Sequence, residues 1–398
     1  MSNRPYDDLK RENLALSRAD QEERPLRCRA LPVKLTLNNT HKCNIACPLC
    51  FKQFEPGANM SYPDMPAAIY RAVAEELFPT ADEISLSVSG EPLVSGNLEE
   101  ELALAGEYGV KVSITTNGVP LAVPRIRRLV LEHIDLIHLS MDAACKETFE
   151  RIRAGARWEQ VMGALEALLR ERAAGKGPRV YANFVMMREN IEELPRWVER
   201  MARVGVDGCC AEHVVVPEAL SVQSLVKHKA LARRLMAEAA KRAAQVGIPL
   251  KLPPPYPVEP EEEEAPPMSR EEARERTMTG AAGTAEGEGA GAGRTPSPEE
   301  IRAWNSRILP GPPVPCPYLW RELWVFHDGG VTCCDTPTYP ERMGRVPEDS
   351  LKEVWNGEKF VELRRRVKSG EVLAACRHCH VASQIDRPED PGAFIKGS

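Results

Sequence analysis

Residues 33–51 read VKLTLNNTHKCNIACPLCF, a short apolar stretch followed at once by three cysteines within eight residues. The alternation of apolar and polar residues in its first half predicts a strand, and Cys43, Cys47 and Cys50 lie in the loop that follows. A cubane iron-sulfur cluster normally takes four thiolates, so a loop with three would leave one iron open to a ligand other than protein. The alternative is a structural zinc site with His41 as fourth ligand, although such sites usually contain regular Cys or His pairs.

This strand is the first of six that alternate with helical patterns. The alternation of short apolar strands with longer segments of three- and four-residue apolar spacing predicts repeated βα units around a parallel sheet. The predicted strands are 33–38, 83–89, 110–116, 134–141, 179–187 and 206–215, and the predicted helices include 66–78, 98–108, 158–174 and 191–204.

The predicted strands carry polar residues on one face. In residues 84–89, ISLSVS, serines alternate with apolar residues, and the strands at 110–116 and 134–141 repeat the pattern. A closed eight-stranded barrel fills its interior with branched apolar side chains, so polar inner faces predict an incomplete (β/α)6 barrel of the TIM type with a solvated lumen. An antiparallel sheet with one wet face is the alternative, but helical connections of this length favour parallel strands.

The composition is that of a globular chain. With 398 residues, of which 43% are hydrophobic and 28% charged, the chain is long enough for two domains. Its first residues are charged and lack the apolar stretch of a signal peptide, and no run predicts a membrane span, so we expect a cytoplasmic protein. Twelve cysteines in a reducing compartment indicate metal ligands, and a net charge of −6 predicts no general attraction to nucleic acid.

Composition also predicts the domain boundaries. Residues 1–31 form an N-terminal extension and residues 32–250 the partial barrel. Residues 251–300 are rich in Pro, Glu and Gly and almost free of large apolar side chains, which predicts a disordered linker. Aromatic residues and cysteines return in residues 301–398, which predicts a smaller α+β domain.

Residues 32–216 resemble the radical S-adenosylmethionine (SAM) family. The Cys-x3-Cys-x2-Cys spacing matches the family signature, and residues 89–92, Ser-Gly-Glu-Pro, resemble its Gly-Gly-Glu-Pro turn with the first glycine replaced by serine. The resemblance implies that the open iron of a 4Fe-4S cluster chelates SAM and that an electron cleaves SAM to methionine and a 5′-deoxyadenosyl radical. It implies SAM contacts from Ser89, Gly90, Glu91, Pro92, Thr116, Asn117, Ser140, Asp142 and Arg153. For Arg153, a solvated helix charge is the alternative.

The C-terminal cysteines resemble the SPASM or twitch extension found in many radical SAM enzymes. The resemblance implies an auxiliary 4Fe-4S cluster, with Cys333 as the fallback for the ligand in the hairpin. A full SPASM domain uses seven cysteines for two clusters, whereas this region has five, so we expect one cluster. A structural zinc site of four thiolates is the alternative. The expected ligands are Cys316, Cys334, Cys376 and Cys379.

Cys209 and Cys210 are the candidate catalytic residues. Alternation along the sixth strand sends one of them into the lumen, where a thiol could return a hydrogen atom to a substrate radical. The alternative is that they only pack in the core, because buried thiols are more often small hydrophobes.

The resemblance implies an oxidoreductase that acts on a peptide or small metabolite and takes electrons from a flavodoxin or ferredoxin. The rival is a noncatalytic iron-sulfur or zinc protein that acts as a redox sensor or scaffold.

Overall fold

The computed structural model describes most of the barrel region and part of the C-terminal region. The described residues are 6–50, 52, 63–86, 89–172, 177–214, 222–255, 269–272, 274, 308–309, 316–334, 342–373 and 376.

The described residues form a ten-stranded sheet in the order β11-β10-β9-β1-β2-β3-β4-β5-β6-β7. The strands β1 to β7 are parallel throughout. The first six lie where the alternation predicts them, and β7 adds a short seventh strand, so the expected incomplete barrel is confirmed. Their bounds are β1 Lys34–Leu37, β2 Glu83–Ser85, β3 Lys111–Thr116, β4 Leu136–Ser140, β5 Arg179–Met186, β6 Gly208–His213 and β7 Leu250–Lys251.

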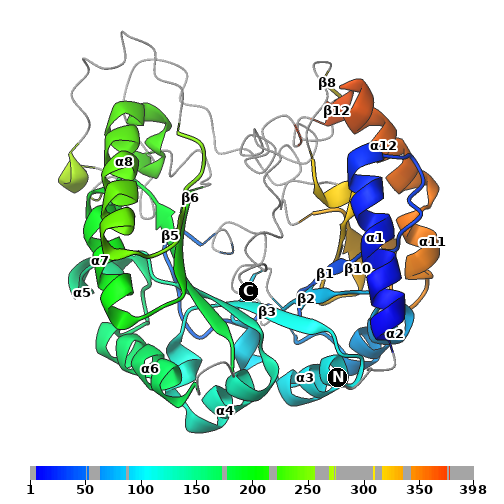
Figure 1. The fold of residues 1–398 in the computed structure, drawn as a ribbon, viewed down its shortest axis with the longest axis horizontal. Coiled ribbons are helices and arrows are strands. Elements are labelled where there is room, and N and C mark those ends of the chain that lie inside the picture. The colour runs from blue at the N-terminus through cyan, green and yellow to red at the C-terminus, as the bar shows by residue number, and fades with distance from the viewer. Residues whose placement is uncertain are drawn as a thin grey trace, which may run out of the picture.

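Helices cover the outer side of this sheet. Figure 1 shows the ribbon curving into an open horseshoe with the strands on its inner side and the helices outside. Buried apolar side chains, such as those of Phe184 and Trp197 with ring centroids 5.0 Å apart, fill the space between the two layers. The helices are α2 Ala67–Leu77, α3 Leu98–Glu107, α4 Pro124–His133, α5 Lys146–Ile152, α6 Trp158–Glu171, α7 Leu194–Val204 and α8 Lys229–Val246.

The inner face of the sheet is polar, as the alternation predicts. The strand register places Ser140, Asn183 and Cys210 side by side across β4, β5 and β6. Nδ1 of His138 lies 3.2 Å from Oδ1 of Asn183 on the same face. Cys209 points the other way and belongs to the apolar core, so Cys210 is the cysteine on the lumen side.

Three C-terminal strands extend the barrel sheet without a break. The strand β9, Glu322–Val325, pairs in parallel with β1, and β10, Gly330–Thr332, and β11, Gly344–Arg345, follow as antiparallel neighbours. The Lys34 ammonium on β1 lies 3.9 Å from the Glu322 carboxylate. Barrel and C-terminal domain therefore share one sheet. The remaining elements are α11 Leu351–Trp355, α12 Glu358–Ser369, and the paired strands β8 Ile308–Leu309 and β12 Val372–Leu373.

The N-terminal extension is folded and joins the two domains. Its helix α1, Asp7–Glu23, lies beside α12 and α2 in Figure 1. The buried Lys10 ammonium donates to the carbonyls of Phe78 and Ala81 at 3.0 and 2.6 Å. Further along the extension, Trp355 on α11 donates to the carbonyl of Ala30 at 2.9 Å. The buried residues of α1 are Lys10, Asn13, Ser17 and Asp20, so this helix is held by polar contacts rather than by an apolar face.

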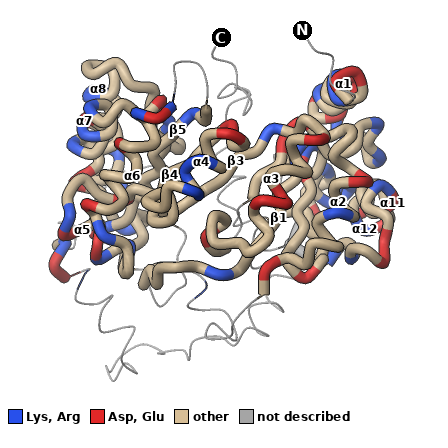
Figure 2. Tube along the Cα trace, turned by 90° about the horizontal axis from the view of Figure 1, so that it is seen from below, with Lys and Arg blue, Asp and Glu red and all other residues tan. Residues whose placement is uncertain are grey.

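Charged residues of both signs are interspersed over the outer helices (Figure 2). Within the described part of the chain, no helix is long and apolar enough to cross a membrane. Of the predicted linker, 269–272 lie against the barrel, where Arg270 Nη2 is 2.6 Å from Glu193 Oε1. Apart from residues 251–255 and 274, the rest of that linker lies outside the described residues.

A substitution of Asn356 tests how the N-terminal extension is attached to the C-terminal domain. The Asn356 side chain exchanges two hydrogen bonds with the backbone of Cys28, at 2.8 and 2.9 Å, and accepts a third from Arg364 at 3.1 Å. Because each net hydrogen bond contributes about 1 kcal/mol, Asn356→Ala should lower the free energy of unfolding by about 2 to 3 kcal/mol in a denaturant titration.

Lys368→Ala is the control, because its exposed ammonium makes a single bond to the carbonyl of Arg24, at 2.7 Å. We expect its effect to stay within about 0.5 kcal/mol. Equal losses in the two variants would contradict a specific role for Asn356.

Candidate active site

The loop with the first three cysteines follows shortly after β1. Two backbone hydrogen bonds hold it, one to the segment after α5 and one within the loop. The Ala46 amide donates to the carbonyl of Ala154, directly after α5, at 2.8 Å. Within the loop, the Cys50 amide donates to the carbonyl of Cys47 at 3.1 Å. Cys43 is exposed, and Cys47 and Cys50 are half-buried, so one loop holds all three thiols.

The turn at residues 89–92 packs directly on this loop. Gly90 has φ of +138°, and a Cβ atom at this position would lie 2.7 Å from the carbonyl oxygens of both Thr40 and Lys42. The next amide, of Glu91, donates to the carbonyl of Lys42 at 2.8 Å. Only glycine allows so close an approach, so the turn can lie in direct contact with the backbone that leads into the cysteine loop.

Ser89, the residue that replaces a family glycine, holds His41. The Ser89 hydroxyl lies 2.8 Å from Nδ1 of His41 and accepts a hydrogen bond from Asn38 at 3.2 Å. His41 is buried, and its ring centroid lies 5.4 Å from that of His327 in the C-terminal domain. His41 therefore connects the two domains beside the cysteine loop, and its Nδ1 is engaged by Ser89.

The buried carboxylate of Glu91 ties the ends of β2 and β3 together. It accepts hydrogen bonds from the Thr116 hydroxyl and the Asn117 amide, both at 2.7 Å, and from the Leu93 amide at 3.2 Å. Burial raises the pKa of Glu91 to about 7, although these hydrogen bonds oppose the rise. Its side chain is fully used in positioning the turn, which leaves the backbone of the turn for a ligand. Pro92 follows it, buried at the start of a short 3-10 helix.

Two nitrogen donors reach the cysteines, one directly after β3 and one at the carboxyl end of α5. Asn117 Nδ2 lies 3.8 Å from Cys43 Sγ, and Arg153 Nη1 lies 3.9 Å from Cys47 Sγ. Asp142 orients the guanidinium through a contact of 2.6 Å with Arg153 Nε. The Arg153 side chain is only 19% exposed, whereas a solvated charge on a helix surface would be mostly exposed.

The same arrangement sets the charge on the thiols. Burial raises the pKa of Cys47, and the positive charge of Arg153 opposes the rise. A guanidinium and an amide that donate to sulfur stabilise thiolate over thiol. The donor set therefore fits three thiolates that would hold an iron-sulfur cluster, with the turn at 89–92 packed beside them.

The structure brings most of the predicted site together. Eight of the nine predicted SAM contacts are linked to the cysteine loop directly or through one another by the hydrogen bonds and turn geometry above. Ser140 is buried at the end of β4, and its described contacts do not reach the loop.

The second cysteine set is also gathered in space. Cys333 Sγ lies 3.9 Å from Cys334 Sγ. Burial raises the pKa of Cys333 well above its usual value, and Cys334, Cys316 and Cys376 raise it further, so these four thiols are neighbours. Cys333 and Cys334 both remain candidates for the hairpin ligand, and Cys379 lies outside the described residues.

The zinc alternative for the C-terminal set involves Cys379, which lies outside the described residues, so the described part of the chain does not decide between zinc and an iron-sulfur cluster. There, no three His, Cys, Asp or Glu side chains lie close enough together to hold one metal ion. A single zinc ion draws its ligands to about 2.0 to 2.3 Å from one centre, whereas a cubane cluster holds its thiolates further apart.

Sequence reasoning missed several residues that position the site. Asn38 and His41 support the turn from β1, and Asn190 supports Asp142 by donating to its carbonyl at 2.9 Å. Asn38 and Asn190 each follow the carboxyl end of a strand, which is the edge where α/β folds bind ligands. Their position after a predicted strand is the sequence signal that could have identified these two asparagines.

The chain matches two protein families. It matches the Radical SAM superfamily over residues 37–218 and the iron-sulfur cluster-binding SPASM domain over residues 316–380. Together these matches cover more than half of the chain, and they coincide with the two cysteine sets.

Individual relatives are more distant. The chain is 25% identical over 228 residues to the "Tungsten-containing aldehyde ferredoxin oxidoreductase cofactor-modifying protein" of Pyrococcus furiosus, covering 55% of this chain and 62% of the relative. It is 32% identical over 183 residues to the "PqqA peptide cyclase" of Granulibacter bethesdensis, covering 44% and 45%. The chain thus spans about half the length of these curated relatives.

A solved structure shares the fold. Streptococcus suis SuiB bound to the precursor peptide SuiA superposes with a TM-score of 0.57 at 14% identity, covering 95% of this chain and 82% of SuiB. At this identity, the likeness concerns the fold alone.

Gly90→Ala tests the contact between turn and cysteine loop. The added Cβ would meet two carbonyl oxygens at 2.7 Å in a backbone conformation that favours glycine. We expect the variant to lose at least about 2 kcal/mol of unfolding free energy and to retain less iron after anaerobic reconstitution, measured by colorimetric iron assay.

Gly106→Ala is the matched control. It lies in α3, where an added Cβ would meet nothing within 4 Å, so the variant should gain about 0.5 to 1 kcal/mol and keep its iron. Normal iron content in Gly90→Ala would show that the close approach is unnecessary for the cluster.

Proposed function

Because the chain belongs to the radical SAM superfamily and carries a C-terminal SPASM domain, we propose that it is an oxidoreductase that cleaves SAM reductively and removes a hydrogen atom from a substrate in the barrel lumen. The observation that carries the proposal is the cysteine loop itself, which has three thiols, two nitrogen donors beside them and a glycine turn packed against it. When bound, SAM on its 4Fe-4S cluster would supply the 5′-deoxyadenosyl radical.

The residues of the chain have distinct roles in this proposal. Cys43, Cys47 and Cys50 hold the cluster, and Arg153 and Asn117 offset the negative charge of the thiolates. The backbone of the turn at 89–92 binds the amino group of SAM.

The auxiliary cysteines would hold a second 4Fe-4S cluster. A cluster with four protein thiolates has no open iron, so its role is to accept or relay an electron. The ligands would be Cys316, Cys376, Cys379 and one of Cys333 and Cys334.

The names of the relatives indicate a broad class of substrate. The names of the Granulibacter and Streptococcus proteins refer to peptides, and that of the Pyrococcus protein refers to a cofactor. A peptide or a small metabolite is therefore the proposed substrate, with a flavodoxin or ferredoxin as electron donor.

Iron content and SAM cleavage test the proposal together. Anaerobically reconstituted protein should hold about eight iron atoms, four for each cubane. Changing Cys43, Cys47 and Cys50 together to alanine should remove half of them. Reduced wild-type protein with SAM should release 5′-deoxyadenosine slowly without substrate, measured by chromatography, and Cys47→Ala should abolish the release.

The control is Cys28→Ala, a buried cysteine far along the chain from the C-terminal set and outside the first cysteine loop; it should keep the iron and the cleavage. A wild type with both clusters, reduced by several donors and still without 5′-deoxyadenosine, would favour a noncatalytic redox sensor. Zinc at the C-terminal set would contradict the auxiliary cluster.

Cys210 distinguishes redox-neutral chemistry from oxidation. It lies on the lumen face beside Asn183, and burial raises its pKa to about 12, so it stays a thiol that can donate a hydrogen atom. If the reaction is redox-neutral, Cys210→Ala should still form 5′-deoxyadenosine but lose the normal product, measured by mass spectrometry.

Cys209→Ala is the adjacent control, because its side chain belongs to the core. It should leave the product unchanged. An unchanged product in both variants would favour oxidation, in which the auxiliary cluster takes the electron. We favour oxidation, because a fully ligated second cluster is an electron acceptor that a redox-neutral reaction does not need.

A further inference from the structure

A group of cationic residues lies apart from both cysteine sets, at the carboxyl ends of β5 and β6. Arg188 follows β5, and the segment 222–228 leads from β6 into α8. The fully buried Gln223 fixes the two together: its carbonyl accepts from the Arg188 amide at 2.9 Å, and its side chain accepts from the Glu189 amide at 3.1 Å. Loops at this end of parallel barrel strands are where substrates bind.

His228 gives this group an unsatisfied polar atom. It is the N-cap residue of α8, it is 7% exposed, and its buried Nδ1 has no hydrogen-bond partner among the residues that the structure describes. A buried polar nitrogen normally has a partner. The His228 ring makes no cap hydrogen bond to the helix, so the nitrogen is available to a ligand.

The helix end beside His228 is positive. The helix α8 has 18 residues and no acidic residue in its first turn, so its N-terminal amides and dipole favour an anion. Lys227 precedes it. The pKa of His228 is lowered, first by burial and then by the charges of Arg188 and Lys227, which places both cations near the ring.

The acidic residues of the group are matched by arginines. Glu192 Oε1 lies 2.9 Å from Arg188 Nη1 and is 45% exposed, whereas the Arg188 side chain is 4% exposed. The buried Glu189 contacts Arg151. With these pairs formed, Lys227 and the helix end still give the group an excess of positive charge.

We propose that Arg188, His228 and the N-terminus of α8 form an oxyanion-binding site that takes a carboxylate or phosphate group of the substrate. A guanidinium, an imidazole N–H and helix amides are the donors that such oxygens accept from. The position on the strand-end face would let the site anchor a remote acidic group while another part of the substrate reaches the cysteine loop. The assignment to a substrate rests on the proposed function, whereas the site itself does not.

Anion binding to the reconstituted full-length protein tests the site. Succinate and inorganic phosphate are the probes, titrated by calorimetry at constant ionic strength. We expect wild type to bind at least one of them in the millimolar range, and His228→Leu to weaken that binding about tenfold or more. Binding of succinate alone would identify a carboxylate as the ligand group, and binding of phosphate alone a phosphate.

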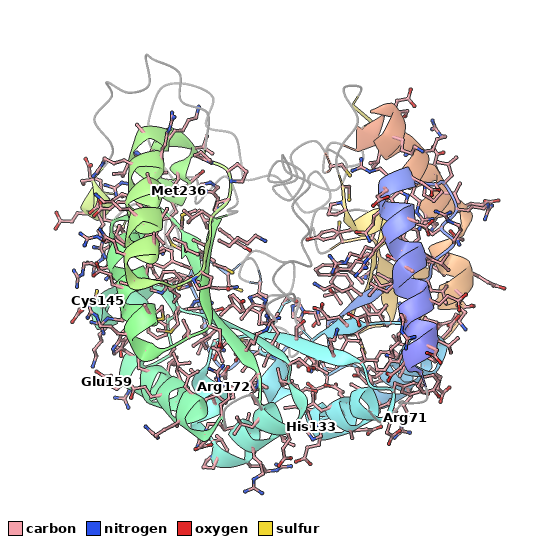
Figure 3. The ribbon with its side chains drawn as sticks, viewed as in Figure 1. Arg71, His133, Cys145, Glu159, Arg172 and Met236 are labelled. Carbon is pink, nitrogen blue, oxygen red and sulfur yellow. The ribbon has the colours of Figure 1, made fainter. Side chains whose placement is uncertain are left out.

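His133→Leu is the matched control, because His133 lies on the outer rim of the barrel, away from the lumen (Figure 3). It should bind the probes as wild type does. Lys227→Glu is a second variant on an exposed residue; it should weaken binding severalfold with an unchanged melting temperature, which separates loss of the site from loss of the fold.

Three results would overturn the inference. They are no binding of either anion by wild type, equal binding by wild type and His228→Leu, and full displacement of the anion by SAM, which would assign the group to the cofactor. Probe binding that depends on His228 in a protein without SAM cleavage would leave the anion site standing and remove the proposed function. SAM cleavage without anion binding that depends on His228 would contradict the anion site and leave the proposed function standing.

Discussion

The pairing of β1 on both of its edges is the constraint on which the rest of the structure depends. On one side β1 is hydrogen-bonded to β2 of the barrel, and on the other to β9 of the SPASM domain. Its carboxyl end leads directly into the cysteine loop. A single strand of four residues therefore fixes the barrel, the C-terminal domain and the first cysteine set relative to one another.

This pairing requires polar residues to be buried along the junction. The Thr36 hydroxyl donates to the Glu322 carboxylate at 2.5 Å, and Lys34 lies between Glu83 and Glu322 at 3.8 and 3.9 Å. Buried charges are tolerated only when they are paired, so these residues specify which strand joins β1. A purely apolar edge would pair equally well in other registers.

The sequence predicted the barrel well, because its signals are local. Period-two alternation located all six expected strands, and three cysteines at fixed spacing located the loop. The same alternation showed that one of Cys209 and Cys210 faces the lumen but not which one, since a shift of one residue reverses the two. The register against Asn183 decides for Cys210.

Long-range polar contacts were beyond sequence reasoning. The hydrogen bond from Thr36 to Glu322 joins residues that are far apart in the chain, and nothing in the sequence of either strand identifies its partner. The sequence indicates only a charged N-terminal extension and does not predict that the polar residues Lys10 and Asn13 of α1 are buried. They are buried, and they donate to backbone carbonyls.

Ser89 shows how one substitution can connect these levels. A glycine there would leave the turn able to pack on the cysteine loop, since Gly90 makes the close contact. The serine hydroxyl adds a bond to His41, whose ring lies against His327 of the SPASM domain. The cysteine loop is consequently bound to the auxiliary domain twice, through the β1 backbone and through this side-chain contact. A movement of the C-terminal domain would therefore displace the three cysteines with it, so the shared sheet sets the distance between the two cysteine sets.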